Sequence, residues 1–417
     1  MPGGSESEVV MERSVVGIDV GSYKITVLVA EIGEEGETRI VGVGRVPSRG
    51  VGKGVIVNVA EATAAIAEAV EQAEQSSGYQ IERAFVGVSG AHITSHNSQG
   101  VVGVARRDRG ITPDDVDRVL EAAGAIVLPQ NQELLHIIPR TYTVDGQEGV
   151  RDPLGMHGFR LEVEAHVVTG SVTAVQNLTK CVTGAGVEVS ELVLTSLAAG
   201  NAVLTKTERE MGVVLVDIGE GTVDIAIFIE GSVWYTRSIT LGGEYITKDI
   251  ATLLRLPPEV AEEIKVKHGH AFAAHVPEDE RFTIAPYGEG GPVVIPRWKL
   301  AEIIQPRCEE ILEGVQQEIK RSGYDGLLPA GVVLCGGTAQ MPGMETLARD
   351  MLEMPVRIGV PHGLSGLTEK VSGPDAATAV GLVQWVPLWE QLGGWKASVG
   401  APWWKKLGPW LRALLPG

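Results

Sequence analysis

The chain of 417 residues has few cysteines, a deficit of basic residues and no long apolar run. Its three cysteines, Cys181, Cys308 and Cys335, lie far apart in apolar surroundings, which predicts buried thiols in a reducing compartment such as the cytoplasm. There are 35 Lys and Arg against 53 Asp and Glu, a net charge of −18, which argues against nucleic acid as a main partner. Because no stretch approaches the ~20 apolar residues of a membrane span and no signal peptide is recognisable, we expect any membrane contact to be peripheral.

What the chain does have is 44% hydrophobic residues and 53 glycines, which suit an α/β protein with many tight turns. One run, VVLVDIGEGTVDIAIF at 213–228, reads as an apolar strand that ends at Asp217, a turn with Gly219 and Gly221, and a second strand over 223–229. A glycine-rich turn can cradle a phosphate, and a carboxylate at a strand end can hold magnesium through water. An ordinary hairpin is the alternative.

A second run repeats this layout. In VVGIDVGSYKITVLVAE, residues 15–31, Asp19 ends a strand and Gly21 opens the turn, 198 residues before Asp217. Such self-similarity predicts two related α/β halves, with a phosphate chain held between facing hairpins.

Between these runs, residues 84–163 interrupt the first architecture, and we expect an inserted domain there, with a helix that starts at Thr112-Pro113. His92 and His96 are expected to be surface residues rather than metal ligands, because no third ligand is near. His136 is expected to be a satisfied core or edge residue. The basic turn with Arg106, Arg107 and Arg109 is either a solvated loop or a partner site.

Three later features extend the candidate site. Gly231–Leu241 reads as a strand pair, and Gly243 then precedes a helix at a point where the chain could touch the phosphates again. Glu262 and Lys265 are spaced i, i+3, for which an exposed ion pair is the plain interpretation. The run GVVLCGGTAQMPG, residues 331–343, is a strand followed by a glycine turn that could hold a base or ribose, or could be a packing turn.

The C-terminal tail differs in composition from the rest of the chain. Six of the eight tryptophans lie at or after Trp385, and from Lys396 onward there are four basic residues and no acid. Projected as a helix, the tail has an apolar arc opposite its basic residues, which predicts a helix lying on an anionic membrane surface. A helix docked on the chain's own surface is the alternative, and Pro409 should kink the helix. The residues expected at the membrane are Trp403, Trp404, Lys405, Lys406, Leu407, Trp410, Leu411, Arg412, Leu414 and Leu415.

These features together resemble the FtsA family of bacterial cell-division proteins, membrane-bound relatives of actin. The likeness covers about residues 14–385 and is carried by GIDVGSYKI, LVDIGEGTVDIAIF, AEEIKVKHG, LCGGTAQMPGM and the inserted run at 111–170. The resemblance implies an actin-like ATPase fold with ATP and magnesium in the cleft. It also implies self-assembly into protofilaments, tethering of the FtsZ C-terminal tail to the inner membrane, and contacts with other division proteins at the septum.

The resemblance further implies a division into subdomains. Residues 1–13 are an expected disordered N-terminus. Subdomain IA is 14–83 with 164–205 and 356–385, and the inserted subdomain IC is 84–163. Subdomain IIA is 206–245 with 298–355, and IIB, the expected FtsZ-docking surface, is 246–297. A linker at 386–401 precedes the membrane-targeting helix at 402–417.

Carried over residue by residue, Asp19 and Asp217 would orient the magnesium waters, Glu262 and Lys265 would contact the ribose, and Met341 would flank the adenosine. The implied nucleotide-binding set is Asp19, Gly21, Ser22, Tyr23, Lys24, Asp217, Gly219, Glu220, Gly221, Thr222, Gly243, Glu262, Lys265, Gly336, Gly337, Thr338 and Met341.

Two departures from the family pattern bear on activity. The family usually has Gly where this chain has Glu220, so an extra acid either repels the phosphates or points outward. No Gln or Glu that could orient an attacking water is recognisable around Thr195-Ser196, so we expect slow hydrolysis at most. The alternatives to a division scaffold are a soluble phosphotransferase or chaperone-like ATPase of the same superfamily and the platform protein of a pilus-assembly machine.

Overall fold

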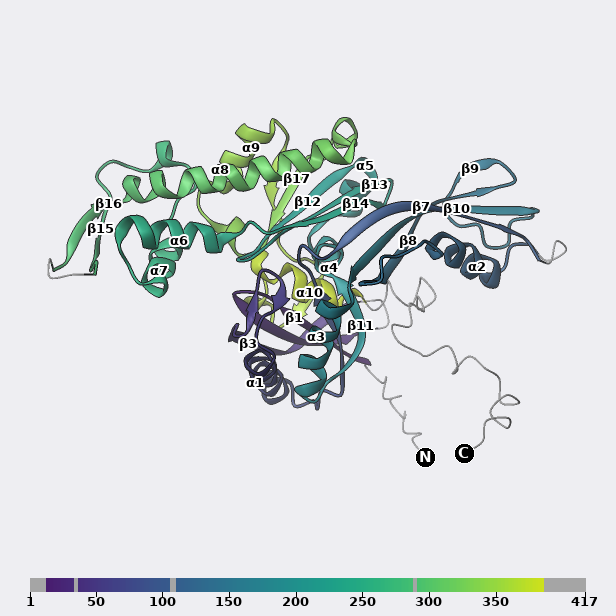
Figure 1. Ribbon diagram of the computed structural model, residues 1–417, viewed down its shortest axis with the longest axis horizontal. Coiled ribbons are helices and arrows are strands. Elements are labelled where there is room, and N and C mark those ends of the chain that lie inside the picture. Colours follow the sequence, from purple (N-terminus) through teal and green to yellow (C-terminus); the bar gives the residue numbers. More distant parts are fainter. Residues whose placement is uncertain (1–12, 34–36, 106–109, 288–290, 386–417) are drawn as a thin grey trace, which may run out of the picture.

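The computed structural model describes residues 13–33, 37–105, 110–287 and 291–385. The predicted tail helix and its linker, the basic turn at Arg106, Arg107 and Arg109, and residues 1–12 lie outside these ranges. In the described part of the chain, no helix is both long enough and apolar enough to span a bilayer. The molecule is elongated, with a four-stranded sheet at one end and the hairpin of β15 (Arg281–Ile284) and β16 (Val293–Pro296) at the other (Figure 1).

A six-stranded sheet forms the first half of the molecule. Helices α1 (Val59–Ser77) and α3 (Val172–Gly184) lie on one side of it, while α4 (Thr195–Val203) and α10 (Ala377–Val383) pack on the other. The first strand is parallel to β6 and antiparallel to β2. The strand order is β11 (Glu188–Leu194), β6 (Arg83–Val88), β1 (Arg13–Val20), β2 (Lys24–Ile32), β3 (Thr38–Pro47) and β19 (Leu364–Gly366).

Helix α1 shows how the sequence sets this packing. Asn58 caps it, since the side-chain Oδ1 accepts hydrogen bonds from the N–H groups of Ala60 and Glu61, and Gly78 ends it in the left-handed conformation with φ of 77°. Its buried face is rich in alanine, so the helix lies close to β3. A Cβ built on Gly44 would come within 1.8 Å of the Ala69 carbonyl oxygen, which means that only glycine fits there.

The second half repeats the arrangement of the first. Its five-stranded sheet has the order β14 (Ser232–Ile239), β13 (Val223–Ile229), β12 (Val213–Ile218), β17 (Val332–Cys335) and β18 (Val356–Ile358). The series β17–β12–β13–β14 thus matches β6–β1–β2–β3, which confirms the predicted pair of related α/β halves. Helices α6 (Gly243–Leu254), α7 (Pro258–His268), α8 (Arg297–Ser322) and α9 (Met344–Leu352) accompany this half.

A four-stranded sheet with one helix extends from the first half (Figure 1). Its order is β7 (Thr94–Gly103), β10 (Arg160–Ser171), β8 (Gln132–Val144) and β9 (Gln147–Val150), and α2 (Pro113–Gly124) packs on it. The predicted start of α2 is confirmed, because Thr112 and Asp115 form a capping box. The prediction for His136 is also confirmed, since its buried Nε2 accepts the N–H of Leu194 at 3.1 Å.

The prediction of a strand pair over Gly231–Leu241 is wrong. The structure has a single strand there, β14, which pairs along β13 after a tight turn at Glu230-Gly231. Both of these turn residues have positive φ, at 54° and 80°, so the chain reverses before Ser232 rather than within the segment.

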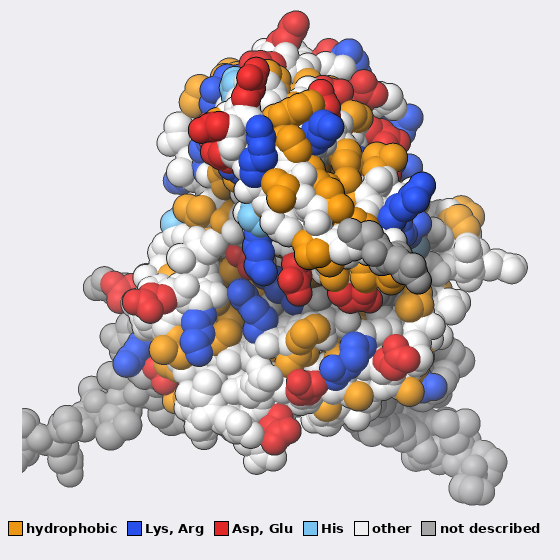
Figure 2. All heavy atoms as spheres, turned by 90° about the vertical axis from the view of Figure 1, so that its left-hand side faces the viewer, with side chains coloured by type: hydrophobic (Ala, Val, Ile, Leu, Met, Phe, Trp, Pro, Cys, Tyr) orange, Lys and Arg blue, Asp and Glu red, His pale blue; other side chains and the backbone are white. Residues whose placement is uncertain are grey.

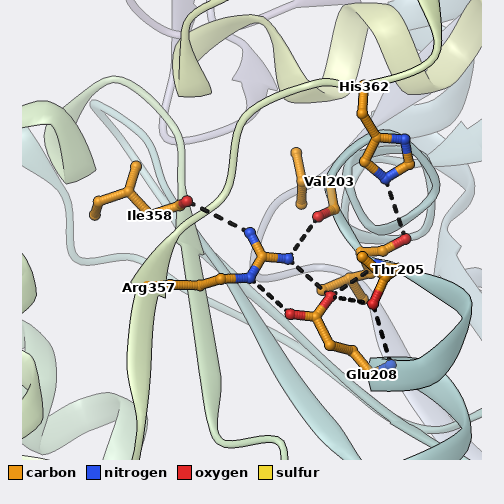
Figure 3. Close-up of polar contacts among 7 residues, drawn as sticks. Val203, Thr205, Glu208, Arg357, Ile358 and His362 are labelled. Carbon is orange, nitrogen blue, oxygen red and sulfur yellow. Dashed lines mark hydrogen bonds and ion pairs between the residues drawn. The ribbon is translucent and has the colours of Figure 1, made fainter.

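The chain passes from the first half to the second after α4, and it returns after β18. An ion pair connects these two regions (Figure 3). Arg357 on β18 donates from Nε and Nη2 to the carboxylate of Glu208 on α5 (Lys206–Met211), at 2.6 and 2.8 Å, and from Nη2 to the Val203 carbonyl oxygen at 2.8 Å. The hydroxyl and N–H of Thr205 donate to the same carboxylate. These contacts, which we call the Arg357–Glu208 clamp, join the segment that follows α4 to strand β18.

Candidate functional site

A cavity of about 330 Å³ lies between the two halves, where the β1–β2 turn and the β12–β13 turn face one another. The turns are built alike, because Gly21 N–H donates to the Lys24 carbonyl at 3.1 Å and Gly219 N–H donates to the Thr222 carbonyl at 2.9 Å. Apart from Gly243, every residue of the implied nucleotide-binding set lines this cavity. The structure therefore brings together residues that are more than 300 positions apart in the sequence.

Gly243 lies behind the cavity wall at the start of α6. Its N–H donates to the Gly219 carbonyl at 3.0 Å, and its own carbonyl accepts a bond from Lys265 Nζ at 3.2 Å. It thus supports the β12–β13 turn from outside, and a side chain here would collide with Thr338, Glu220 and Lys265.

Three aspartates, Asp19, Asp217 and Asp224, meet at the floor of the cavity. Asp217 and Asp224 are directly opposite one another in the β12–β13 pair, and Asp19 ends β1 in the other half. Burial raises the pKa of Asp217 to about 7, with further increases from the charges of Asp224 and Asp19. Burial likewise raises the pKa values of Asp19 and Asp224 to about 6 each.

Such a cluster of carboxylates suits a cation. Asp224 is 6% exposed, and its Oδ2 accepts hydrogen bonds from the hydroxyls of Thr222 at 3.2 Å and Thr195 at 3.3 Å. Its buried Oδ1 accepts no hydrogen bond of good geometry, although the nearby Ser238 hydroxyl lowers the pKa of Asp224. Within the residues that the structure describes, no three His, Cys, Asp or Glu side chains are arranged to hold a metal directly.

Lys24 places an ammonium beside the aspartates. Its Nζ forms an ion pair with Asp375 on the short turn 374–376, and Arg45 Nη1 lies 3.5 Å from the same carboxylate. Both Lys24 and Asp375 line the cavity. Lys24 comes from the first half of the sequence and Asp375 from its end, so the ion pair holds the β1–β2 turn against the segment before α10.

Glu262 and Lys265 are not the exposed ion pair that their spacing suggests. Lys265 is only 7% exposed, and its Nζ lies 2.6 Å from Glu262 Oε2. The same Nζ lies 3.3 Å from Glu220 Oε2 and donates to Thr247 Oγ1 at 2.8 Å. The helix α7 packs against α6 and the β12–β13 turn, which buries the pair. The Glu220 side chain therefore points toward this lysine rather than outward, and the expected repulsion between Glu220 and the phosphates stays a prediction.

The third glycine turn, after β17, closes the site from the side of α9. Thr338 Oγ1 donates to the Gly219 carbonyl at 3.0 Å, which ties this turn to the β12–β13 turn. Gly336 has φ of 88°, and a Cβ there would lie 2.3 Å from Asp217 Oδ1. Only glycine can place the backbone this close to the carboxylate.

The cavity is also lined by residues outside the predicted set, and the polar ones nearest the aspartates are Asp224, Thr195, Thr378 and Asp375. The position of Asp224 could have been predicted, because it is the one charged residue in the apolar strand 223–229. A tight turn at 219–222 places it opposite Asp217. Thr378 Oγ1 donates to Asp217 Oδ2 at 3.0 Å. No local sequence pattern indicates that Thr378, Thr195 and Asp375 line the cavity, because the packing of α4 and α10 against distant segments places them there.

The remaining histidines of interest lie elsewhere. His92 Nδ1 accepts the N–H of Ser171 at 3.3 Å, while His96 is an exposed residue of β7. A second cavity of about 370 Å³ lies among β8, α4, β13 and Trp385, and none of the predicted site residues lines it.

Several known proteins are similar to this chain over most of its length. The cell division protein FtsA of Pseudomonas aeruginosa is 45% identical over 387 residues, 93% of this chain and 92% of that protein. The chain belongs to the FtsA family. The FtsA proteins of Bacillus subtilis and Escherichia coli are 42% and 36% identical over 88% and 96% of the chain. The family model described as cell division protein FtsA matches residues 214–381, and that of the SHS2 domain inserted in FtsA matches 90–169.

Solved structures place this FtsA-family chain among actin-like folds. The PilM–PilN type IV pilus biogenesis complex is similar with a TM-score of 0.64, 17% identity and coverage of 89% of this chain and 98% of that one. MreB5 of Spiroplasma citri bound to ADP has a TM-score of 0.54 at 14% identity, covering 93% of this chain and 99% of that one. The MamK double helical filament has a TM-score of 0.52 at 14% identity, with coverage of 90% and 99%. The predicted actin-like α/β fold is thereby confirmed.

Proposed function

We propose that this protein is an ATP-binding, membrane-associated scaffold of the division septum, which polymerises and tethers FtsZ filaments to the cytoplasmic face of the inner membrane. The observation that carries the proposal is the cavity itself, where two glycine turns face each other over Asp19 and Asp217. Membership of the FtsA family supports the cellular role. A pilus-assembly platform shares only the fold, at 17% identity, and is the weaker candidate. A soluble phosphotransferase would have no use for a basic amphipathic tail.

The nucleotide's phosphates are assigned to the backbone of the two glycine turns, 21–24 and 219–222, on the side of Lys24 and away from the Glu220 side chain, which points toward Lys265. A magnesium ion would be held through water by Asp19 and Asp217, and it would neutralise the phosphate charge when bound. Met341 and the turn at 336–338 would flank the adenosine. Thr195 Oγ1 donates to Asp224, and its neighbour Ser196 is buried, so neither residue offers a general base for water. ATP is therefore proposed to act mainly as an assembly switch with slow turnover.

The tail is proposed to provide membrane attachment. Each basic residue is worth ~1 kcal/mol near an anionic leaflet, so one tail with Lys405, Lys406 and Arg412 is a modest anchor. Several tails on one polymer act together through their effective concentration. Polymerisation and membrane binding would therefore reinforce each other, and the filament-forming neighbour MamK has the same fold.

The proposed docking surface for the FtsZ tail is the segment 246–297, designated subdomain IIB. Figure 2 looks onto this end of the molecule, where hydrophobic side chains lie among both basic and acidic side chains. The exposed hydrophobic residues there are Leu253, Val266, Tyr287, Val293 and Val294. Such a surface suits a short peptide with apolar and acidic residues. The remaining subdomains are proposed with the boundaries given above, except that residues 84–88 are assigned to IA, because β6 pairs within the six-stranded sheet. IC is the proposed contact for other division proteins.

The test is co-sedimentation of the full chain on anionic vesicles, with and without ATP and an FtsZ tail peptide. We expect the protein to pellet with the vesicles and to recruit the peptide, more strongly with ATP. The Trp410→Glu variant is expected to stay in solution, because it places a charge in the apolar arc of the tail. The matched control is Trp298→Glu, on α8 and far from the tail in sequence. Equal pelleting of the Trp410→Glu and unaltered proteins would reject membrane attachment through the tail.

A further inference from the structure

The ammonium of Lys265 has more acceptors than protons. Four oxygens surround its Nζ: Glu262 Oε2 at 2.6 Å, Thr247 Oγ1 at 2.8 Å, the Gly243 carbonyl at 3.2 Å and Glu220 Oε2 at 3.3 Å. An ammonium donates three hydrogen bonds, so the most distant partner, Glu220, is the least well satisfied. Burial raises the pKa of the Glu220 carboxyl, and the charge of Glu262 raises it further, while the charge of Lys265 lowers it. The Glu220 carboxylate therefore retains capacity to accept a hydrogen bond.

Glu220 is held in this position by the backbone as well. The N–H of Glu244 donates to the Glu220 carbonyl at 2.9 Å, so the β12–β13 turn is fixed to the first turn of α6. A Cβ built on Gly243 would lie 2.8 Å from Glu220 Oε2 and 2.6 Å from Thr338 Oγ1. The carboxylate thus lies over the start of α6, next to the third glycine turn, and lines the cavity.

The charges divide the cavity into two ends with different chemistry. At one end Lys24 and the three aspartates suit phosphates with a cation. At the other, two carboxylates, Glu220 and Glu262, share the single ammonium of Lys265, which leaves a net negative charge. An anionic phosphate is disfavoured at this second end. A neutral group with neighbouring hydroxyls fits it, since each hydroxyl can donate to a carboxylate and accept from the ammonium.

We propose that Glu220 is a sugar-recognising residue, whose carboxylate accepts a hydrogen bond from a ribose hydroxyl and makes the site selective for ribonucleotides over deoxyribonucleotides. The inference rests on the proposed nucleotide site and adds a specificity role to it. A site built to bind a hydroxyl discriminates strongly against an analogue without it, because the buried acceptor then loses its partner. Glu220 keeps part of its bond to Lys265 in that case, so the discrimination is expected to be about tenfold.

The experiment measures the affinities of the full chain for ATP, 2′-deoxy-ATP and 3′-deoxy-ATP with magnesium, by displacement of a fluorescent nucleotide. The unaltered protein is expected to prefer ATP over one deoxy analogue by about tenfold. Glu220→Gln and Glu220→Gly are both expected to reduce that preference to less than about threefold. The matched control is Glu263→Gln, which removes a carboxylate from the same helix as Lys265, but one that is 68% exposed and paired with Lys267.

Each outcome decides the question. If the unaltered protein binds no nucleotide, the proposed function fails and the inference fails with it. If it binds all three nucleotides equally, only the sugar-recognising role is overturned. If both Glu220 variants tighten all three nucleotides by the same factor, Glu220 opposes phosphate charge, and the inference is wrong. If Glu263→Gln changes the preference for ATP over the deoxy analogue as much as Glu220→Gln does, the change results from the loss of any nearby negative charge, and the inference is again wrong.

Discussion

Replacing Asp217 with Asn tests the electrostatics of the cavity floor. Asn has nearly the same shape as Asp, and its side-chain oxygen can still accept the hydrogen bond that Thr378 Oγ1 donates at 3.0 Å. The substitution therefore removes a charge and little else. It is expected to stabilise the nucleotide-free protein at high pH and, if Asp217 has its proposed role in holding the cation, to weaken binding of ATP with magnesium.

The magnitude follows from proton binding. The Asp217 pKa is raised from 3.8 to about 7, mainly by burial. Between these values the folded protein holds a proton that the unfolded chain has released, so the free energy of unfolding falls as the pH rises through this window. Each tenfold change in proton affinity is worth ~1.4 kcal/mol, which sets an upper bound of about 4 kcal/mol. Water in the cleft and sharing of the effect with Asp19 and Asp224 reduce the expected gain in the Asn variant to about 2 kcal/mol at pH 8.

The assay is denaturant unfolding of nucleotide-free protein from pH 4.5 to pH 8, followed by the same series with saturating ATP and magnesium. We expect the two proteins to have nearly equal stability at pH 4.5 and to diverge as the pH rises, with the Asn variant more stable. Ligand should reverse the order, since it stabilises the unaltered protein more. The matched control is Asp350→Asn on the exposed face of α9. A constant difference across the pH range, or a destabilised variant at pH 8, would refute the reasoning.

Two further predictions concern stability. Arg357→Ala should lower the free energy of unfolding by about 2 kcal/mol, because it leaves the partly buried carboxylate of Glu208 without its charged partner. In a double-mutant cycle, Arg357→Ala combined with Glu208→Gln should cost clearly less than the sum of the two single changes, and strict additivity would show that the clamp is not coupled. Gly44→Ala should destabilise by about 2–3 kcal/mol, because its methyl group collides with the Ala69 carbonyl oxygen, whereas Gly326→Ala, with no atom within 4 Å of the new Cβ, should be close to neutral. Equal unfolding midpoints for the two glycine variants would contradict the close approach of α1 to β3.

Much of the fold could be read from local patterns. The strands that carry Asp19 and Asp217 and the helix start at Thr112 are confirmed, because each depends on residues within a few positions of one another. The segment 231–241 was misread, since a strand pair and a single strand preceded by a tight turn have similar alternation. What decides between them is the pairing with β13, which is a tertiary contact.

The same division applies to the candidate site. The sequence by itself determined the two aspartate hairpins, their duplication and the glycine turn after β17, because a turn that needs glycine, or a strand that ends in a carboxylate, is visible locally. Only the tertiary structure decided the burial of Lys265, the direction of Glu220, and the arrival of Thr195, Asp375 and Thr378 at the cavity. Those features depend on how α4, α7 and α10 pack between and against the two sheets. Side-chain direction and pKa are properties of surroundings assembled from distant segments, and no local pattern encodes them.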